Sequence, residues 1–174
     1  QRNLSNCFKK HNPVAYDRVV IFSRLKRLEP QTRLLRLIPN LVFLEHDACQ
    51  NYMEESHNKG AYTRFYKAIP GCRVISSGYQ VSQALRRDGV DADFVAKGFD
   101  ERLIKNCHAP RDISAAFIGS IKHTVYQKRK RMLEDISNRI PLRIERTNSG
   151  ADYATLLNRI RVFVNADSGM HEYM

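Results

Sequence analysis

Three ionisable residues, Glu45, His46 and Asp47, follow directly on the apolar run LVFL. An imidazole beside carboxylates can act as a general base, or it can hold a phosphate or a sugar hydroxyl while a carboxylate orients it. The structural alternative is a histidine that only ends a strand. His46 and Asp47 are therefore candidate catalytic residues, and Glu45 is a second group able to orient the imidazole.

The segment FIGSIKH, residues 117–123, carries a second group of residues suited to phosphate chemistry. Gly119 and Ser120 follow an apolar run and precede a helical pattern, so backbone N–H groups there can face a diphosphate while Lys122 neutralises it. The spacing is that of neither a Walker loop nor G-x-G-x-x-G, so the signal alone is weak. The basic run at 128–131 is typical of a solvated helix face, with contact to a lipid or another polyanion as the sharper alternative.

Further polar residues stand where strands are expected to end. The triplet SSG at 76–78 has the residue types of a helix N-cap, and Lys97, Gly98 and residues 165–169 follow later apolar runs. In open parallel sheets, ligands bind beyond the carboxyl ends of the strands. These strand ends are therefore where a site is expected.

Strands and helices alternate along the first half of the chain. A continuous apolar run such as residues 19–22 is typical of a strand buried on both faces of a parallel sheet. Val81, Ala84 and Leu85 share one face of a helix that Gly89 is placed to end. The pattern predicts strands at 19–22, 41–48 and 73–75 and within 91–99, with helices at 29–38, 59–69 and 79–88.

At residue 113 the alternation starts afresh. Strands are expected at 113–120, 141–146 and 162–169, with helices at 124–140 and 151–160. Thr124 and Gln127 have capping-box spacing, and one helix face carries Val125, Met132, Leu133, Ile136 and Ile140. The pattern predicts an α/β protein with parallel sheets and right-handed crossovers. We expect one domain at 1–110 and a second at 111–174, which looks truncated after its third strand.

Composition narrows the class of partner. The 174 residues include 29 Lys and Arg against 18 Asp and Glu, a net charge of +11 that favours an anionic partner: nucleic acid, an acidic membrane leaflet or a phosphorylated small molecule. The four cysteines lack zinc-ligand spacing, and no run is long enough to span a bilayer. We therefore expect a cytoplasmic protein, with peripheral contact to the inner face of the membrane left open.

The order of these segments resembles a retaining GT-B glycosyltransferase of group 1, and the second half is most similar to its spore-maturation CgeB-type branch. VISSGYQVSQALRRDGVDADFVAKGFDERLI resembles the end of that family's acceptor domain and its turn into the interdomain linker. AAFIGSIKHTVYQKRKRMLEDI resembles the opening strand and helix of the donor domain. DYATLLNRIRVFVNADSG resembles the helix and strand before the acidic donor segment. The resemblance covers most of residues 16–174.

The resemblance implies a GT-B arrangement of two Rossmann-like parallel-sheet domains, both incomplete in this chain. It places Gly119, Ser120 and Lys122 at the donor's diphosphate, with Lys122 and Arg129 standing in for the family's arginine-lysine pair. Glu172 matches the first of two family glutamates, whose partner falls beyond residue 174. The family's glycine-rich loop before the first strand is also absent. The implied chemistry uses no metal and no cofactor, because the nucleotide sugar is itself a substrate.

The predicted function is transfer of a sugar from a nucleoside-diphosphate donor to a cell-surface polysaccharide, lipopolysaccharide, lipid-linked or other glycan acceptor, with an anionic membrane surface as a further partner. The alternative is a non-catalytic basic α/β module that binds nucleic acid or another polyanion. Such a module needs exposed aromatic residues on a basic face. Most tyrosines and phenylalanines here fall in apolar runs or on helix faces, so we expect them in the core and rank nucleic acid below a nucleotide sugar.

Overall fold

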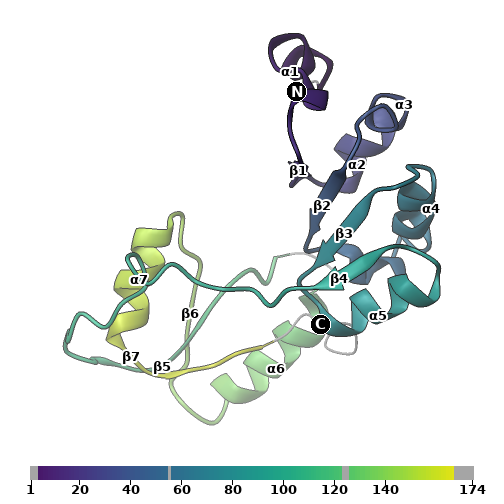
Figure 1. Cartoon of the computed structure of the whole chain (residues 1–174). Helices are drawn as coiled ribbons and strands as arrows, with labels where there is room; N and C mark the ends of the chain where they lie inside the picture. The colour runs from purple at the N-terminus through teal and green to yellow at the C-terminus, as the bar shows by residue number, and fades with distance from the viewer. Residues whose placement is uncertain (1–3, 55, 123–125, 167–174) are drawn as a thin grey trace. The chain divides into compact units, whose positions relative to one another are not determined.

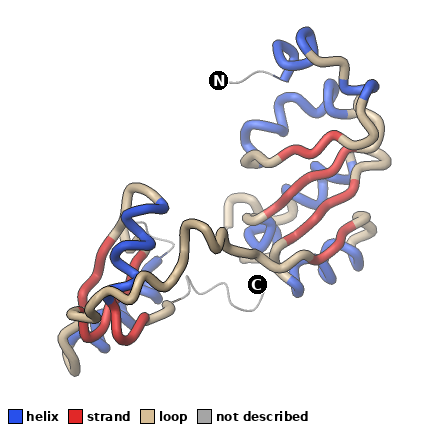
Figure 2. Tube along the Cα trace, turned by 60° about the vertical axis from the view of Figure 1, so that its left-hand side comes forward, coloured by secondary structure: helices blue, strands red, loops and turns tan. Residues whose placement is uncertain are grey.

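The computed structural model describes residues 4–54, 56–122 and 126–166. The chain divides into two compact units, and the division falls between Lys97 and Gly98. Each unit has a parallel sheet of its own, drawn as arrows in Figure 1 and in red in Figure 2. The protein is therefore α/β, with two small parallel sheets of four and three strands and a Rossmann-like alternation of strands and helices.

The sheet of the first unit has the strand order β1-β2-β3-β4, which is also the order along the chain. The strands are β1 (Val19–Ile21), β2 (Leu41–Glu45), β3 (Arg73–Ser76) and β4 (Ala92–Phe94), and all neighbours are parallel. Register aligns Phe43 with Val74, and Val74 with Ala92. The carboxyl ends of β2, β3 and β4 therefore open at one edge of the sheet.

Two helical segments of the first unit precede β1, and the others connect the strands. They are α1 (Leu4–Lys10), η1 (Pro13–Ala15), α2 (Leu25–Leu28), η2 (Glu29–Gln31), α3 (Thr32–Leu35), η3 (Ala48–Asn51), α4 (Ala61–Lys67) and α5 (Tyr79–Arg87). In α5 the predicted face of Val81, Ala84 and Leu85 is buried, and Gly89 takes the left-handed φ of +80° expected after a helix end.

The predicted bounds of the helix at 29–38 are wrong. Helical structure begins earlier, at Leu25, and ends at Leu35, so Leu37 is exposed while Leu35 and Ile38 are buried. The physical reason lies just downstream, because Pro39 cannot continue a helix and Asn40 adopts a positive φ of 54°.

The aromatic core of the first unit lies on one face of its sheet, although Val42 on the other face is buried as well. Phe43 meets the rings of Phe65 and Tyr66 from α4, each at a centroid distance of 5.4 Å. On the other face Val20 is 62% exposed and Ile75 is half-buried. The expectation that residues 19–22 are buried on both faces is therefore wrong. β1 is an edge strand, and strands that add in one direction through right-handed crossovers place their connections on one face.

The sheet of the second unit has the order β6-β5-β7, again parallel. Its strands are β5 (Ile113–Ile118), β6 (Arg143–Glu145) and β7 (Ile160–Phe163), and its helices are α6 (Gln127–Ser137) and α7 (Gly150–Arg159). β7 begins two residues before the predicted strand at 162–169. Thr124 of the expected capping box lies outside the described residues.

Two small apolar clusters hold this second sheet. Phe117 packs with Leu133 of α6, and Ile118 packs with the cluster that Leu156 of α7 joins. Because successive residues of a strand point to opposite faces, α6 and α7 cover opposite faces of the sheet. The prediction of a buried apolar face on α6 is largely wrong. Within α6 only Leu133 is buried, and Met132 is 41% exposed. Ile140 is exposed as well, and Val125 lies outside the described residues.

The segment before β5 belongs to the second unit through specific polar contacts. The backbone N–H of Cys107 donates to Asn158 Oδ1 at 2.8 Å, and Asn158 Nδ2 donates to the carbonyl of Lys105 at 2.9 Å. Arg159 of α7 forms an ion pair with Asp112. These contacts explain why the division of the chain falls before Gly98 and not at the predicted boundary after residue 110.

Candidate functional site

A pocket of about 240 Å³ opens at the carboxyl ends of β2, β3 and β4 in the first unit. The loops after these three strands and the first turn of α5 line it. Its chemically distinctive residues are His46, Cys49, Ser77, Tyr79, Phe94 and Lys97. The pocket is therefore where the sequence placed its first candidate site, beyond the ends of parallel strands.

His46 lines this pocket, as the sequence predicted. Its backbone N–H donates to Glu45 Oε1 at 2.8 Å, and its ring lies edge to face with Phe22 at a centroid distance of 5.0 Å. Within the described part of the chain, the imidazole nitrogens have no hydrogen-bond partner. The ring is thus held by an aromatic contact while its nitrogens remain able to meet a ligand.

Glu45 turns away from the pocket and into the core. Its Oε1 accepts the backbone N–H groups of His46 and Asp47, and its Oε2 accepts the hydroxyl of Tyr66 at 2.7 Å. Burial raises the pKa of the Glu45 carboxyl above its ordinary value, although these hydrogen bonds favour the ionised form. Glu45 therefore orients His46 through the backbone, and not by a contact with the imidazole.

Asp47 separates from its two neighbours. Its side chain is exposed and does not line the pocket, and it gives no cap to the 3₁₀-helix η3 that follows. Of the three ionisable residues after LVFL, one is buried, one faces the pocket and one faces solvent. The structure therefore brings His46, but not the Asp47 carboxylate, into the pocket wall.

The serine-glycine triplet closes the turn between β3 and α5. The backbone N–H of Gly78 donates to Ser76 Oγ at 3.2 Å, and the N–H of Ser77 donates to the carbonyl of Glu45 at 3.2 Å. Gly78 occupies the N-cap position and gives no side-chain cap. The triplet therefore supplies the N-cap, as predicted, but at Gly78; neither serine caps the helix with its side chain, and Ser76 stabilises the turn that precedes the helix.

An aromatic pair forms one wall of the pocket. The sequence patterns did not predict this pair. The rings of Tyr79 and Phe94 are perpendicular, with centroids 5.6 Å apart, and the two residues are 52% and 41% exposed. They come from the start of α5 and the end of β4. The available signal was that Tyr79 opens the helix expected after the SSG triplet and that Phe94 lies in the strand expected within 91–99.

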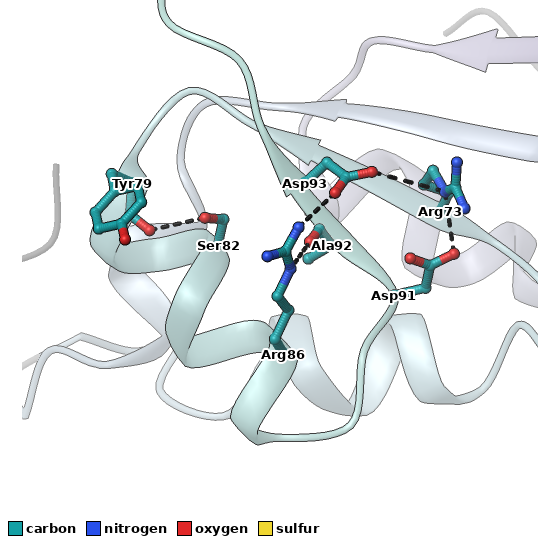
Figure 3. Close-up of polar contacts among 7 residues, drawn as sticks. All are labelled: Arg73, Tyr79, Ser82, Arg86, Asp91, Ala92 and Asp93. Atoms are coloured by element: carbon teal, nitrogen blue, oxygen red, sulfur yellow. Dashed lines mark hydrogen bonds and ion pairs between the residues drawn. The ribbon is translucent and has the colours of Figure 1, made fainter.

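Charged side chains on and beside β3, β4 and α5 are paired with one another. Arg73 forms ion pairs with Asp91 at 3.0 Å and Asp93 at 3.9 Å, and Arg86 of α5 also contacts Asp93 (Figure 3). All are about half exposed, so each pair stabilises the unit by only about 0–1 kcal/mol. The pairing neutralises Asp93, and it ties β3, β4 and α5 together.

The second group of candidate residues lies at the carboxyl end of β5, in the other unit. Because β6 and β7 lie on opposite sides of β5, the chain connections reverse direction there, which makes this end a topological switch point. Gly119 and Ser120 follow β5 directly. The described part of the chain after β7 extends through Asn165 and Ala166, and the N–H of Val164 still pairs with Ala116.

Gly119 is required by packing. An added Cβ would lie 2.5 Å from the Phe117 ring, and the N–H of Gly119 donates to the carbonyl of Glu145 at 2.9 Å. This amide is consequently not available to a diphosphate, contrary to what FIGSIKH suggested. The side chain of Lys122 is exposed at the same end of the sheet.

Arg129 connects the ends of β5 and β7. Its Nη1 donates to the carbonyl of Ser120 at 2.9 Å, and its Nε donates to the carbonyl of Ala166 at 2.7 Å. The guanidinium also lies over the Tyr126 ring at 4.6 Å. The structure thus brings Gly119, Ser120 and Arg129 together, with Arg129 stabilising the loop. Glu172 lies outside the described residues.

Among the residues that the structure describes, no cluster of His, Cys, Asp and Glu could hold a metal ion. Across the same residues, no helix is both long and apolar enough to cross a membrane. No protein-family model matches the sequence, and neither does any curated protein or solved structure.

Proposed function

We propose that this chain acts as a GT-B type glycosyltransferase, transferring a sugar from a nucleoside-diphosphate donor to a cell-surface or lipid-linked glycan acceptor. The observation that carries the proposal is the switch point in the second unit, with Gly119, Ser120 and Lys122 at the carboxyl end of β5. Nucleotides bind at such a point in open α/β sheets, which makes this end the donor side.

On the donor side the proposed roles differ between residues. Lys122, exposed and cationic, neutralises the diphosphate, and the Ser120 hydroxyl donates a hydrogen bond to it. Arg129 acts as a positioning residue, because its bonds to the carbonyls of Ser120 and Ala166 hold the loop in place. Basic groups of this kind stabilise a departing diphosphate without a metal ion.

On the acceptor side the pocket of the first unit supports the proposal. In a retaining transfer the departing phosphate can take the acceptor's proton, so no strong side-chain base is needed. His46 then orients a sugar hydroxyl through an imidazole nitrogen, with Glu45 holding the backbone that carries it. Asp47 is exposed and takes no part in this step.

The alternative, a basic module that binds nucleic acid, also has an observation in its favour. Several aromatic rings are exposed, contrary to the expectation that they lie in the core, and Phe22, Tyr79 and Phe94 gather at one end of the first sheet. Exposed rings of this kind can stack bases. The rings of Tyr79 and Phe94 line a pocket, which favours a small ligand, whereas Phe22 lies outside its lining.

A thermal-shift screen against UDP-, GDP- and ADP-sugars tests the proposal. A donor present at 100 times its Kd stabilises the protein by about 2.7 kcal/mol. Lys122→Ala should weaken that stabilisation, whereas Lys105→Ala, which removes another exposed cation of the same unit, should not. Absence of any shift, together with salt-sensitive binding to random oligonucleotides, would replace the transferase with the nucleic-acid module.

A further inference from the structure

We propose that the pocket at the ends of β2, β3 and β4 binds one sugar ring that carries a negative charge, as a phosphorylated or carboxylated sugar does. The proposal that such a sugar binds concerns this pocket alone. Its assignment as the acceptor site rests on the proposed function. Size, an aromatic wall and the balance of charge in the lining each support this ligand class.

The size of the pocket favours a small ligand. Its volume is about 240 Å³. Pockets for drug-sized ligands run from about 300 to 1,000 Å³. The pocket is therefore smaller than a drug-sized site, and its size suits a single hexose ring with one charged substituent better than a whole nucleotide sugar.

The aromatic wall matches the apolar face of a sugar. Tyr79 and Phe94 leave about half of their surface exposed, and their perpendicular contact fixes the angle between the two rings. The face of an aromatic ring is electronegative, so it attracts the weakly positive C–H groups on one side of a pyranose. Across the pocket, His46 offers a ring nitrogen to the hydroxyl groups on the ligand's polar edge.

The charge of the lining favours an anion. Lys97 contributes an ammonium group, and none of the described residues that line the pocket is Asp or Glu. Of the neighbouring acids, Glu45 is engaged with Tyr66 and Asp93 with Arg73 and Arg86, while Asp47 is exposed outside the lining. Lys97 itself has no ion-pair partner within the described residues. A neutral sugar would leave its charge unmatched, whereas a phosphate or carboxylate would pair with it.

Binding of two acidic sugars, glucose, inorganic phosphate and AMP to the 174-residue chain, measured by calorimetry and NMR, tests the inference. Glucose 6-phosphate and glucuronate should bind at least tenfold more tightly than glucose, which lacks the charge, or inorganic phosphate, which lacks the ring. Lys97→Gln and Phe94→Leu should each weaken glucose 6-phosphate binding at least tenfold. The matched controls Lys67→Gln and Tyr16→Leu replace an exposed cation and an exposed aromatic residue outside the lining, and they should leave binding unchanged.

Three outcomes would overturn the inference. Equal affinity for glucose and glucose 6-phosphate would remove the role of charge, and unchanged affinity in both pocket variants, with native NMR spectra, would remove the pocket. Tighter binding of AMP with the same sensitivity to Phe94→Leu would reassign the pocket to a nucleotide. If acidic sugars bind while no nucleotide sugar does, the pocket assignment stands and the transferase proposal fails. If a nucleotide sugar binds while no acidic sugar does, this inference fails and the transferase proposal stands.

Discussion

At the scale of single residues, Glu45 links the core to the pocket. Its carboxyl group accepts the Tyr66 hydroxyl on one oxygen and two backbone amides on the other, while 7% of the residue is exposed. Burial outweighs these bonds and raises the pKa of Glu45. The folded protein therefore holds the proton more tightly than the unfolded chain does, which makes its stability depend on pH.

We expect the free energy of unfolding to fall as the pH rises from the ordinary glutamate pKa through the raised pKa of Glu45. Below that range the buried acid is protonated in both states, and above it the folded protein must hold a buried carboxylate. Glu45→Gln should flatten this dependence, because an amide keeps the acceptor for both backbone N–H groups and stays neutral. Urea unfolding at several pH values measures it.

The control for this prediction is Glu29→Gln, which alters an exposed carboxyl group of the same unit. That variant should keep the pH dependence of the parent protein. An equally steep pH dependence in Glu45→Gln would show that the effect belongs to another group.

At the scale of elements, the end of β5 depends on close packing between two neighbouring residues. The ring of buried Phe117 covers the α-carbon of Gly119, and the guanidinium of Arg129 lies over the same ring at 5.4 Å. Leu133 of α6 packs beside the ring as well. The loop at the switch point therefore takes its path from the helix and strand that enclose it.

Gly119→Ala should destabilise the protein by about 1–3 kcal/mol, the usual cost of forcing an extra group into a packed site. The new methyl group would lie 2.5 Å from Phe117 Cζ, so the ring or the loop must move. Gly98→Ala is the matched control, because nothing lies within 4 Å of its Cβ position and it should change stability little. Thermal or urea unfolding of both variants measures the difference. Equal stability of the two variants would contradict the packing argument.

At the scale of the whole molecule, the net charge of +11 sets how the protein meets anionic surfaces. We expect binding to vesicles that contain anionic lipid at about 0.1 M salt and at least a tenfold loss at about 1 M salt. Over that range the screening length falls from about 10 Å to about 3 Å. Co-sedimentation measures the bound fraction, and vesicles of neutral lipid are the control. Binding that persists at 1 M salt would point to an apolar contact and would refute the electrostatic account.

Local sequence patterns predicted much of the fold because they depend on near neighbours in the chain. The apolar runs that became β2, β3 and β5, and the periodic face of α5 before Gly89, are confirmed. A buried strand needs apolar residues, and a helix end needs a residue that tolerates positive φ, wherever the chain goes next. The same reasoning wrongly predicted that Val20 is buried, because its exposure depends on β1 being an edge strand.

The sequence by itself determined the α/β alternation, the polar ends of the strands and the place of His46 at one of them. Only the tertiary structure decided which side chains share a site. Tyr79 and Phe94 meet because α5 and β4 pack side by side, and Arg129 meets Ser120 because α6 returns to the end of β5. Such contacts join residues far apart in the chain through packing, which no local pattern of residues encodes.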